Sequence, residues 1–186
     1  MAIDDLIQDA SRRMHKSVEA AQAEFATLRT GRASTGLLDR VQIDYYGQKT
    51  PLKQLATVNS PEPRLITIQP FDPNSVSAIE RAILESDLGL TPSNDGKLIR
   101  LPIPQLTEER RKDLVKIVRQ MAEDGRIAVR NVRRDVMHHL KELVDKGEVG
   151  TDEERRAEER VQKLTDENTH TIDELLKKKE AEILEV

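Results

Sequence analysis

The sequence lacks several features on which common protein classes depend. It has no cysteine, which excludes disulfide frameworks and thiolate zinc sites. Its only aromatic residues are Phe25, Tyr45, Tyr46 and Phe71, so we do not expect a large compact core. No apolar run approaches the roughly 20 residues that cross a bilayer, and the start, MAIDDLIQDA, has neither the basic nor the apolar region of a signal peptide. We therefore expect a cytoplasmic protein that does not enter a membrane.

No catalytic or metal-binding pattern stands out either. Gly31 and Gly36 have the spacing of a phosphate-binding loop, but two leucines follow the second glycine where a lysine and a hydroxyl residue are required. His138 and His139 occupy consecutive positions of a helical pattern, so their rings point to different sides and do not converge on one metal ion. We expect no cofactor, no metal and no enzymatic activity.

Proline placement divides the chain. All eight prolines lie between Pro51 and Pro104, whereas both flanks are rich in the good helix formers Ala, Leu, Glu, Lys and Arg. Apolar residues in the flanks recur every three and four residues, which predicts long amphipathic helices. The three predicted helices cover about residues 3–29, 107–146 and 151 onward, the last with a capping box formed by Thr151 and Glu154.

The middle segment has a different period. Apolar residues alternate from Val41 to Tyr45, Gly47 and Gln48 suit a turn, and further extended runs lie at 55–58, 64–69 and 97–103. A short helix should begin at Asp72 and end near residue 86, and residues 94–96 predict a turn. The predicted fold class is α+β: an elongated antiparallel three-helix bundle of residues 1–30 and 106–186, with a small α+β domain of residues 31–105 inserted between helices one and two.

Two short segments, 30–34 and 102–106, connect the predicted domains. A glycine lies in the first and two prolines lie in the second, a composition that suits either a hinge or a rigid elbow. The candidate hinge residues are Arg29, Thr30, Gly31, Arg32, Pro102, Pro104 and Leu106.

The net charge of −4 hides an uneven distribution. Residues 107–147 carry 11 basic and 8 acidic side chains, whereas residues 148–186 carry 7 and 13. Arg126, Arg130 and Arg133 share one helical face by their spacing of four and three. They could form a solvated surface paired with the acidic third helix, or bind phosphates through bidentate guanidinium hydrogen bonds. No aromatic residue is interleaved, so structured RNA fits this pattern better than stacked single-stranded bases.

Seven blocks of the sequence together resemble the bacterial ribosome recycling factor family. They stand in the family's order and span essentially the whole chain: LRTGRAS at 28–34, YYG at 45–47, PLKQLA at 51–56, SDLGL at 86–90, LTEERRKDL at 106–114, AVRNVRRD at 128–135 and VQKLTD at 161–166. The resemblance implies an L-shaped monomer of tRNA-like dimensions, in which the bundle is the RNA-binding arm and the insert is the other arm.

The resemblance also implies a function without catalysis. Members of the family bind the post-termination ribosome and, together with elongation factor G and its GTP hydrolysis, split it into subunits, which initiation factor three helps to keep apart. The bundle binds large-subunit ribosomal RNA near the peptidyl-transferase centre. The family's important arginines map onto Arg130 and Arg133, with Arg110, Arg29 and Arg32 as lesser candidates. Arg126 joins them by sharing their face. The insert meets elongation factor G.

An interaction protein is the alternative interpretation. In that case the charged faces of the bundle would pair with a helical protein partner, and binding would be indifferent to RNA and to the replacement of Arg133.

Overall fold

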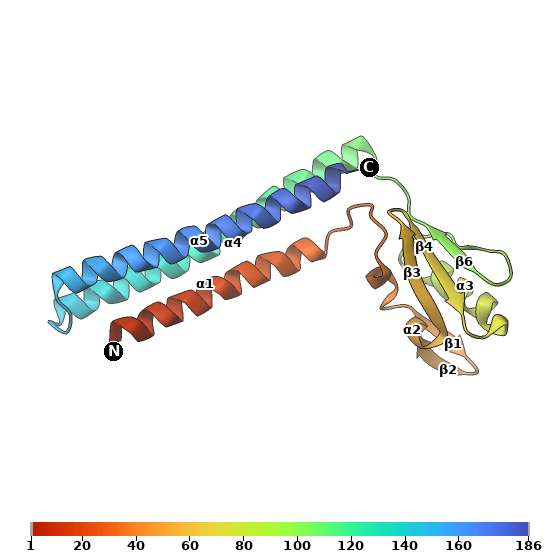
Figure 1. The fold of residues 1–186 in the computed structure, drawn as a ribbon, viewed down its shortest axis with the longest axis horizontal. Coiled ribbons are helices and arrows are strands. Elements are labelled where there is room, and N and C mark those ends of the chain that lie inside the picture. The colour runs from red at the N-terminus through yellow and green to blue at the C-terminus, as the bar shows by residue number, and fades with distance from the viewer. Residues whose placement is uncertain (1, 186) are drawn as a thin grey trace. The chain divides into compact units, whose positions relative to one another are not determined.

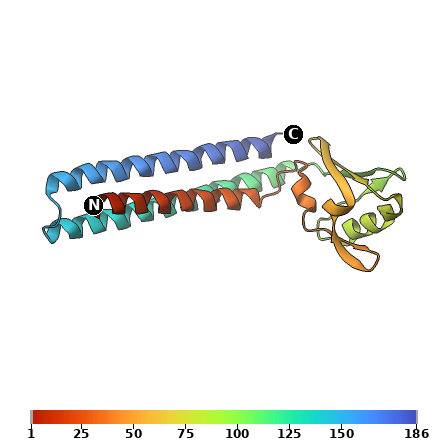
Figure 2. The same cartoon turned by 60° about the horizontal axis from the view of Figure 1, so that its bottom comes forward.

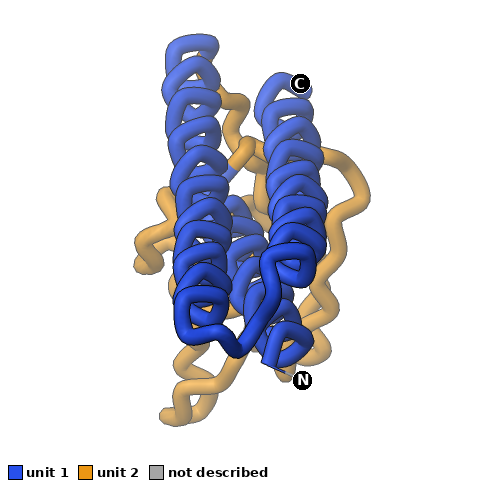
Figure 3. The backbone as a smooth tube through the Cα atoms, turned by 90° about the vertical axis from the view of Figure 1, so that its left-hand side faces the viewer, with its two compact units in different colours: residues 1–29, 108–186 blue, residues 30–107 orange. Residues whose placement is uncertain are grey.

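The computed structural model describes residues 2–185. They form two compact units (Figure 3): one runs to Arg29 and resumes at Glu108, and the other spans Thr30–Thr107. We call the first unit the bundle and the second the insert. No helix within residues 2–185 combines the length and apolarity that spanning a membrane requires.

The bundle consists of three long helices, α1 (Ala2–Ala26), α4 (Glu108–Asp145) and α5 (Thr151–Leu184). They lie side by side, with α4 antiparallel to both α1 and α5 (Figures 1 and 2). Each helix buries a stripe of residues spaced three and four apart, as a 3.6-residue period requires. On α4 the buried residues are Leu114, Val118, Ala122, Gly125, Val129, Val132, Val136 and Leu140.

The buried stripe of α4 differs slightly from the apolar pattern in the sequence. Met121 and Ala128 follow that pattern but are only half-buried, and their neighbours Ala122 and Val129 are fully buried instead. The physical reason is that α4 packs against two helices at once. Its contact surface is therefore broad, and the centre of that surface depends on where α1 and α5 lie.

A small residue sits where the three helices meet. A Cβ atom added to Gly125 of α4 would lie 3.1 Å from Cβ of Ala21 on α1 and 3.2 Å from Cδ1 of Ile172 on α5. Both distances are shorter than ordinary van der Waals contact. Glycine in a helix interior costs about 1 kcal/mol relative to alanine, and here that cost permits close approach of the three helices.

The turn between α4 and α5 ends the first helix in a Schellman motif. Gly147 has a positive φ of 72°, its N–H donates to the carbonyl of Val144, and the N–H of Glu148 donates to the carbonyl of Leu143. The capping box predicted at Thr151 is wrong. Gly150 is the N-cap with extended backbone and no side-chain bond, so α5 already includes Thr151 in its first turn.

The insert contains a two-stranded and a four-stranded antiparallel sheet. The first pairs β1 (Gln42–Tyr45) with β2 (Gln48–Pro51). The second has the order β3-β4-β6-β5, formed by β3 (Ala56–Glu62), β4 (Leu65–Pro70), β6 (Ile99–Pro102) and β5 (Ser93–Asn94). Four short helices lie before or between these strands: η1 (Thr35–Leu38), α2 (Leu52–Leu55), η2 (Pro73–Ser75) and α3 (Val76–Glu85). The helix η2 leads directly into α3.

Aliphatic side chains fill the core of the insert. Ile66 and Ile68 of the central strand β4 are fully buried and alternate with more exposed neighbours, as a period of two requires. They pack in one cluster with residues of β1, β6 and α3, including Ile43, Ile79, Ile83, Ile99 and Leu101. The predicted α+β fold class, a helical bundle with an inserted sheet domain, is confirmed.

Side-chain hydrogen bonds stabilise the predicted helix start at Asp72 and the predicted turn near Asp95. Asp72 accepts a hydrogen bond from the N–H of Asn74 and thereby caps the start of the η2–α3 segment. Asp95 accepts from the N–H groups of Lys97 and Leu98 between β5 and β6. The β1–β2 turn lies one residue earlier than predicted, at Tyr46 and Gly47, both with positive φ. Gln48 already belongs to β2, because a two-residue type I′ loop needs positive φ at both central positions.

Candidate nucleic-acid interface

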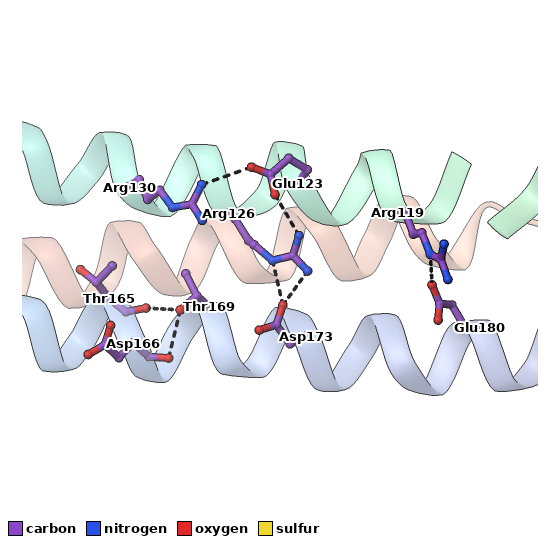
Figure 4. Close-up of polar contacts among 9 residues, drawn as sticks. All are labelled: Arg119, Glu123, Arg126, Arg130, Thr165, Asp166, Thr169, Asp173 and Glu180. Carbon is purple, nitrogen blue, oxygen red and sulfur yellow. Dashed lines mark hydrogen bonds and ion pairs between the residues drawn. The ribbon is translucent and has the colours of Figure 1, made fainter. Parts of the chain in front are cut away.

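A regular series of arginines follows the flank of α4 that faces α5. Arg119, Arg126 and Arg133 recur every seven residues, and each contacts a residue of α5. Arg119 Nε lies 2.6 Å from Glu180 Oε1, and Arg126 Nη2 lies 2.6 Å from Asp173 Oδ1 (Figure 4). We call these cross-helix pairs the α4–α5 ladder and each pair a rung.

Arg126 is the most fully engaged arginine of the ladder. Its Nε and Nη2 both reach Asp173, its Nη1 donates to Glu123 at 2.9 Å, and its side chain is only 20% exposed (Figure 4). Burial acts to lower the pKa of Arg126, but hydrogen bonds to Asp173 and Glu123 outweigh burial and raise it. The guanidinium therefore stays charged, and it braces α4 against α5.

Arg130 lies one turn beyond Arg126 and shares its carboxylate. Its Nη1 lies 3.2 Å from Glu123 Oε1, and 46% of its side chain is exposed (Figure 4). The hydrogen bond from Arg126 is the main cause that lowers the pKa of Glu123, while burial opposes it and Arg130 assists. Arg126 and Arg130 thus share Glu123, and because Asp173 also binds Arg126, two carboxylates balance the two guanidinium groups.

The third rung differs in kind. Arg133 Nη1 donates to Gln162 Oε1 at 3.1 Å, and Gln162 Nε2 donates in turn to Asp166 Oδ1 at 2.9 Å. The direct partner of Arg133 is therefore a neutral amide. The next residue, Arg134, is exposed, and its side chain makes no ion pair or hydrogen bond within residues 2–185. Positive charge consequently concentrates at Arg133 and Arg134, which form no ion pair within residues 2–185 and keep guanidinium donors available for phosphate oxygens.

Arg110 and Arg29 do not lie beside this cluster. Arg110 occupies an exposed position in the first turn of α4, 20 residues before Arg130 and so about 30 Å away along the helix. Arg29 is exposed and follows the end of α1 at the same end of the bundle. The candidate RNA-binding arginines thus form two groups on the bundle rather than one.

The candidate hinge residues lie in segments without helix or strand, except Pro102, which ends β6. Gly31 has a positive φ of 76°, and a Cβ added to it would lie 2.9 Å from Cγ of Leu106. The two connecting segments therefore pack against each other at Gly31 and Leu106.

Gln162 and Asp166 were not among the candidates from the sequence. Gln162 and Asp166 had a recoverable signal, because both lie in the VQKLTD block at a spacing of four. An antiparallel helix pair also brings together residues that are equally distant from its turn. Counting 13 residues outward from each side of residues 146–150 places Arg133 opposite Lys163, the neighbour of Gln162. Among residues 2–185, no cluster of acidic or histidine side chains could hold a metal ion.

Comparisons with known proteins point to one family. A family profile described as ribosome recycling factor matches residues 21–184. The ribosome-recycling factor of Rubrobacter xylanophilus is 57% identical over 180 residues, which cover 97% of this chain and 97% of that protein. The ribosome-recycling factor of Carboxydothermus hydrogenoformans is 51% identical over 184 residues, which cover 99% of this chain and 100% of that protein.

Solved structures similar to this chain belong to the same family. A solution structure of the ribosome recycling factor superposes with a TM-score of 0.75 at 44% identity, covering 100% of this chain and 99% of the other. Models for the T. thermophilus ribosome recycling factor and the E. coli elongation factor G bound to the E. coli post-termination complex include a chain with a TM-score of 0.63 and 48% identity. That match covers 99% of this chain and 100% of the other.

Proposed function

Because the chain belongs to the ribosome recycling factor family, we propose that it binds the post-termination ribosome and, together with elongation factor G, separates the ribosome into subunits. The energy comes from GTP hydrolysis by elongation factor G, and this protein catalyses no reaction itself. It acts in the cytoplasm as a monomer, and initiation factor three then helps to keep the subunits apart. Similarity over nearly the full length of several relatives supports this function.

We propose that Arg133 and Arg130 bind phosphates of large-subunit ribosomal RNA near the peptidyl-transferase centre. The observation that carries this assignment is the neutral partner of Arg133, since Gln162 rather than a carboxylate contacts the guanidinium within residues 2–185. Arg110 and Arg29 form a second, weaker contact at the other end of the bundle. Arg126 braces the bundle instead, because carboxylates occupy its donors and its side chain is largely buried.

The mechanism follows from a division between the two units. Arginines on a stiff helical rod fix the bundle to RNA, while elongation factor G acts on the insert. The two connecting segments are short and pack together at Gly31 and Leu106, so we propose that they transmit a push on the insert to the bundle and to the RNA beneath it. They act as a hinge that limits motion rather than as a free linker.

Two assays test this function. Binding to isolated large ribosomal subunits and GTP-dependent splitting of post-termination ribosomes, followed by light scattering with elongation factor G, should be measured for the wild type and for Arg133→Ala. Arg156→Ala is a matched control, because Arg156 is an exposed arginine of α5 without an ion pair in the described chain. We expect the wild type and Arg156→Ala to bind and split, and Arg133→Ala to lose at least tenfold in affinity, the size of a charge-assisted contact.

Either of two results would contradict the proposal. If Arg133→Ala binds as tightly as the wild type, the RNA site lies elsewhere. If the wild type splits no ribosomes with elongation factor G from the same source, the recycling function is wrong and a helical protein partner becomes the better explanation.

A further inference from the structure

The three rungs of the α4–α5 ladder have unequal charge. Arg119 and Arg126 each face a carboxylate of α5, Glu180 and Asp173, so both rungs are neutral overall. The rung of Arg133 instead has the neutral amide of Gln162 as its direct partner, and the carboxylate of Asp166 bonds to Gln162 rather than to Arg133. The arginines of α4 are evenly spaced, so the residue type of the α5 partner decides which of them lacks a direct ion pair.

Arg126 and Arg133 also differ in how many of their N–H donors are used within the bundle. Arg126 uses Nε, Nη1 and Nη2 within the bundle. Arg133 uses only Nη1, for its bond to Gln162. A guanidinium has five N–H donors in one plane, so Arg133 keeps a free edge that can bind a phosphate through two parallel hydrogen bonds.

Asp166 fixes which way the Gln162 amide points. Its carboxylate accepts a hydrogen bond from Gln162 Nε2, which leaves Oε1 to accept from Arg133. A flipped amide would direct N–H donors at the guanidinium, and two donors cannot bond to each other. The chain Asp166–Gln162–Arg133 is therefore satisfied in one orientation only.

We propose that Gln162, oriented by Asp166, is a positioning residue that holds Arg133 toward RNA without forming an ion pair with it. This inference rests on the proposed function, in that Arg133 must bind RNA phosphate. The inference gives the VQKLTD block a role. The segment supplies the one rung of the ladder within residues 2–185 that has no direct ion pair, and so places the phosphate contact near Arg133 rather than along the whole helix.

The test replaces the amide by the carboxylate found in the other rungs. In Gln162→Glu, Arg133 gains an ion pair like those of Arg119 and Arg126. We expect its thermal midpoint to stay close to that of the wild type, because the gained cross-helix ion pair is offset by the lost hydrogen bond to Asp166 and by repulsion between two carboxylates four residues apart. Affinity for isolated large ribosomal subunits should fall roughly tenfold, as for loss of one charge-assisted contact. The slope of log K against log salt should fall by about one.

Two further variants separate charge from position. Gln162→Met keeps position 162 uncharged but removes the acceptor, so affinity should fall about threefold, the lower end of what a hydrogen bond contributes, with the salt slope unchanged. Thr171→Glu adds the same charge to α5 at an exposed position nine residues on, which lies on the opposite side of the helix from Gln162. It should bind within about twofold of the wild type, because an exposed charge at that distance is screened.

The outcomes distinguish this inference from the proposed function. If Arg133→Ala binds like the wild type, the RNA site itself is wrong. If Arg133→Ala binds weakly but Gln162→Glu retains full affinity and the full salt slope, Gln162 does not set the charge of Arg133 and the inference is overturned. If Gln162→Met binds like the wild type, or Thr171→Glu binds as weakly as Gln162→Glu, positioning through this rung is likewise refuted.

Discussion

The bundle and the insert are stabilised by different kinds of contact. In the bundle, side chains from distant parts of the sequence meet across helices, both in the apolar stripe and in charged pairs such as Arg13–Asp135, 2.6 Å apart between α1 and α4. In the insert, turns such as the one at Asp95 are held by neighbours in sequence, and one cluster of aliphatic residues forms the core. The bundle thus depends on register between helices, whereas the insert depends on local turns and one dense core.

The surfaces differ as well. The bundle exposes arginines whose charge is partly cancelled by α5, while the insert exposes two of the chain's few aromatic side chains, Tyr46 and Phe71. A charged rod suits RNA phosphates, and a surface with exposed rings suits a protein. This contrast agrees with a protein in which one unit holds RNA and the other meets elongation factor G, as proposed above.

Large-to-small changes in each core should have the largest effect. Ile66→Ala in the insert and Leu140→Ala in the bundle remove fully buried side chains and should each lower the free energy of unfolding by about 3 kcal/mol. If the units are stabilised separately, hydrogen exchange should show amides losing protection only in the unit that carries the change. Ile127→Ala, at a 44% exposed position of α4, is the control and should cost less than about 1 kcal/mol. Equal loss of protection in both units would contradict separate stabilisation.

Gly125→Val tests the close approach of the three helices. The added side chain would enter a space where a single Cβ already lies 3.1 Å from Ala21, so we expect a loss of about 2 kcal/mol in urea unfolding. Ile172→Val in the same chain should restore part of that loss, because it removes the Cδ1 atom that would lie 3.2 Å from the new Cβ. Gly150→Ala is the control, since nothing lies within 4 Å of its added Cβ. If Gly125→Val has the same urea midpoint as the wild type, the three helices can move apart at this point without a loss of stability.

Acid should weaken the bundle through Asp135. The hydrogen bond from Arg13 lowers the pKa of Asp135, against a smaller opposing effect of burial, and the charge of Arg13 assists. A carboxyl group with a lowered folded pKa stabilises the protein above its unfolded pKa of about 3.9 and loses that contribution as pH falls through the folded value. The difference in free energy of unfolding between wild type and Asp135→Asn should therefore be largest above about pH 5 and shrink in more acidic solution.

Two variants complete the acid experiment. Asp113→Asn alters an exposed aspartate of α4 that makes no ion pair in the described chain, so its curve should run parallel to the wild type. Asp95→Asn acts in the insert, where backbone N–H groups of Leu98 and Lys97 lower the pKa of Asp95. Its effect should stay within the β5–β6 turn in hydrogen exchange, whereas that of Asp135→Asn should reach both α1 and α4. A difference that stays constant from pH 7 to pH 3 would rule out the Asp135 contribution.

The sequence predicted the parts of the fold that depend on local patterns. Periodic apolar residues predicted α1, α4 and α5 to within a few residues, and Asp72 and Asp95 marked a helix start and a turn because their carboxylates bond to nearby N–H groups. Strand β2 and helix α2 were missed, since Pro51 joins two four-residue elements that are too short to show a period. The family resemblance, drawn from seven blocks, is confirmed by the comparisons.

The candidate site was less predictable from the sequence. Arg119, Arg126 and Arg133 are the same residue type at the same spacing, so nothing local distinguishes a structural arginine from one available to RNA. Their difference arises from α5, where Asp173 lies opposite one arginine and Gln162 opposite another. Counting outward from the turn between the helices comes only near these pairings, so the exact partner of each arginine follows from the three-dimensional structure.

The smallest effect should come from the tip of the β1–β2 hairpin. Tyr46 has a φ of 49° and its ring is 82% exposed, a backbone conformation that asparagine adopts more readily than tyrosine. Tyr46→Asn gives up an edge contact with the ring of Tyr45, whose centroid is 4.5 Å away, but that contact is largely solvated. The net gain should be a few tenths of a kcal/mol in thermal unfolding of the insert, with no change in hydrogen exchange of the bundle. Tyr46→Phe keeps ring and backbone and should match the wild type. A clear loss of stability in Tyr46→Asn would show that the ring contact outweighs the backbone cost, and that aromatic contacts stabilise the insert as well as its aliphatic core.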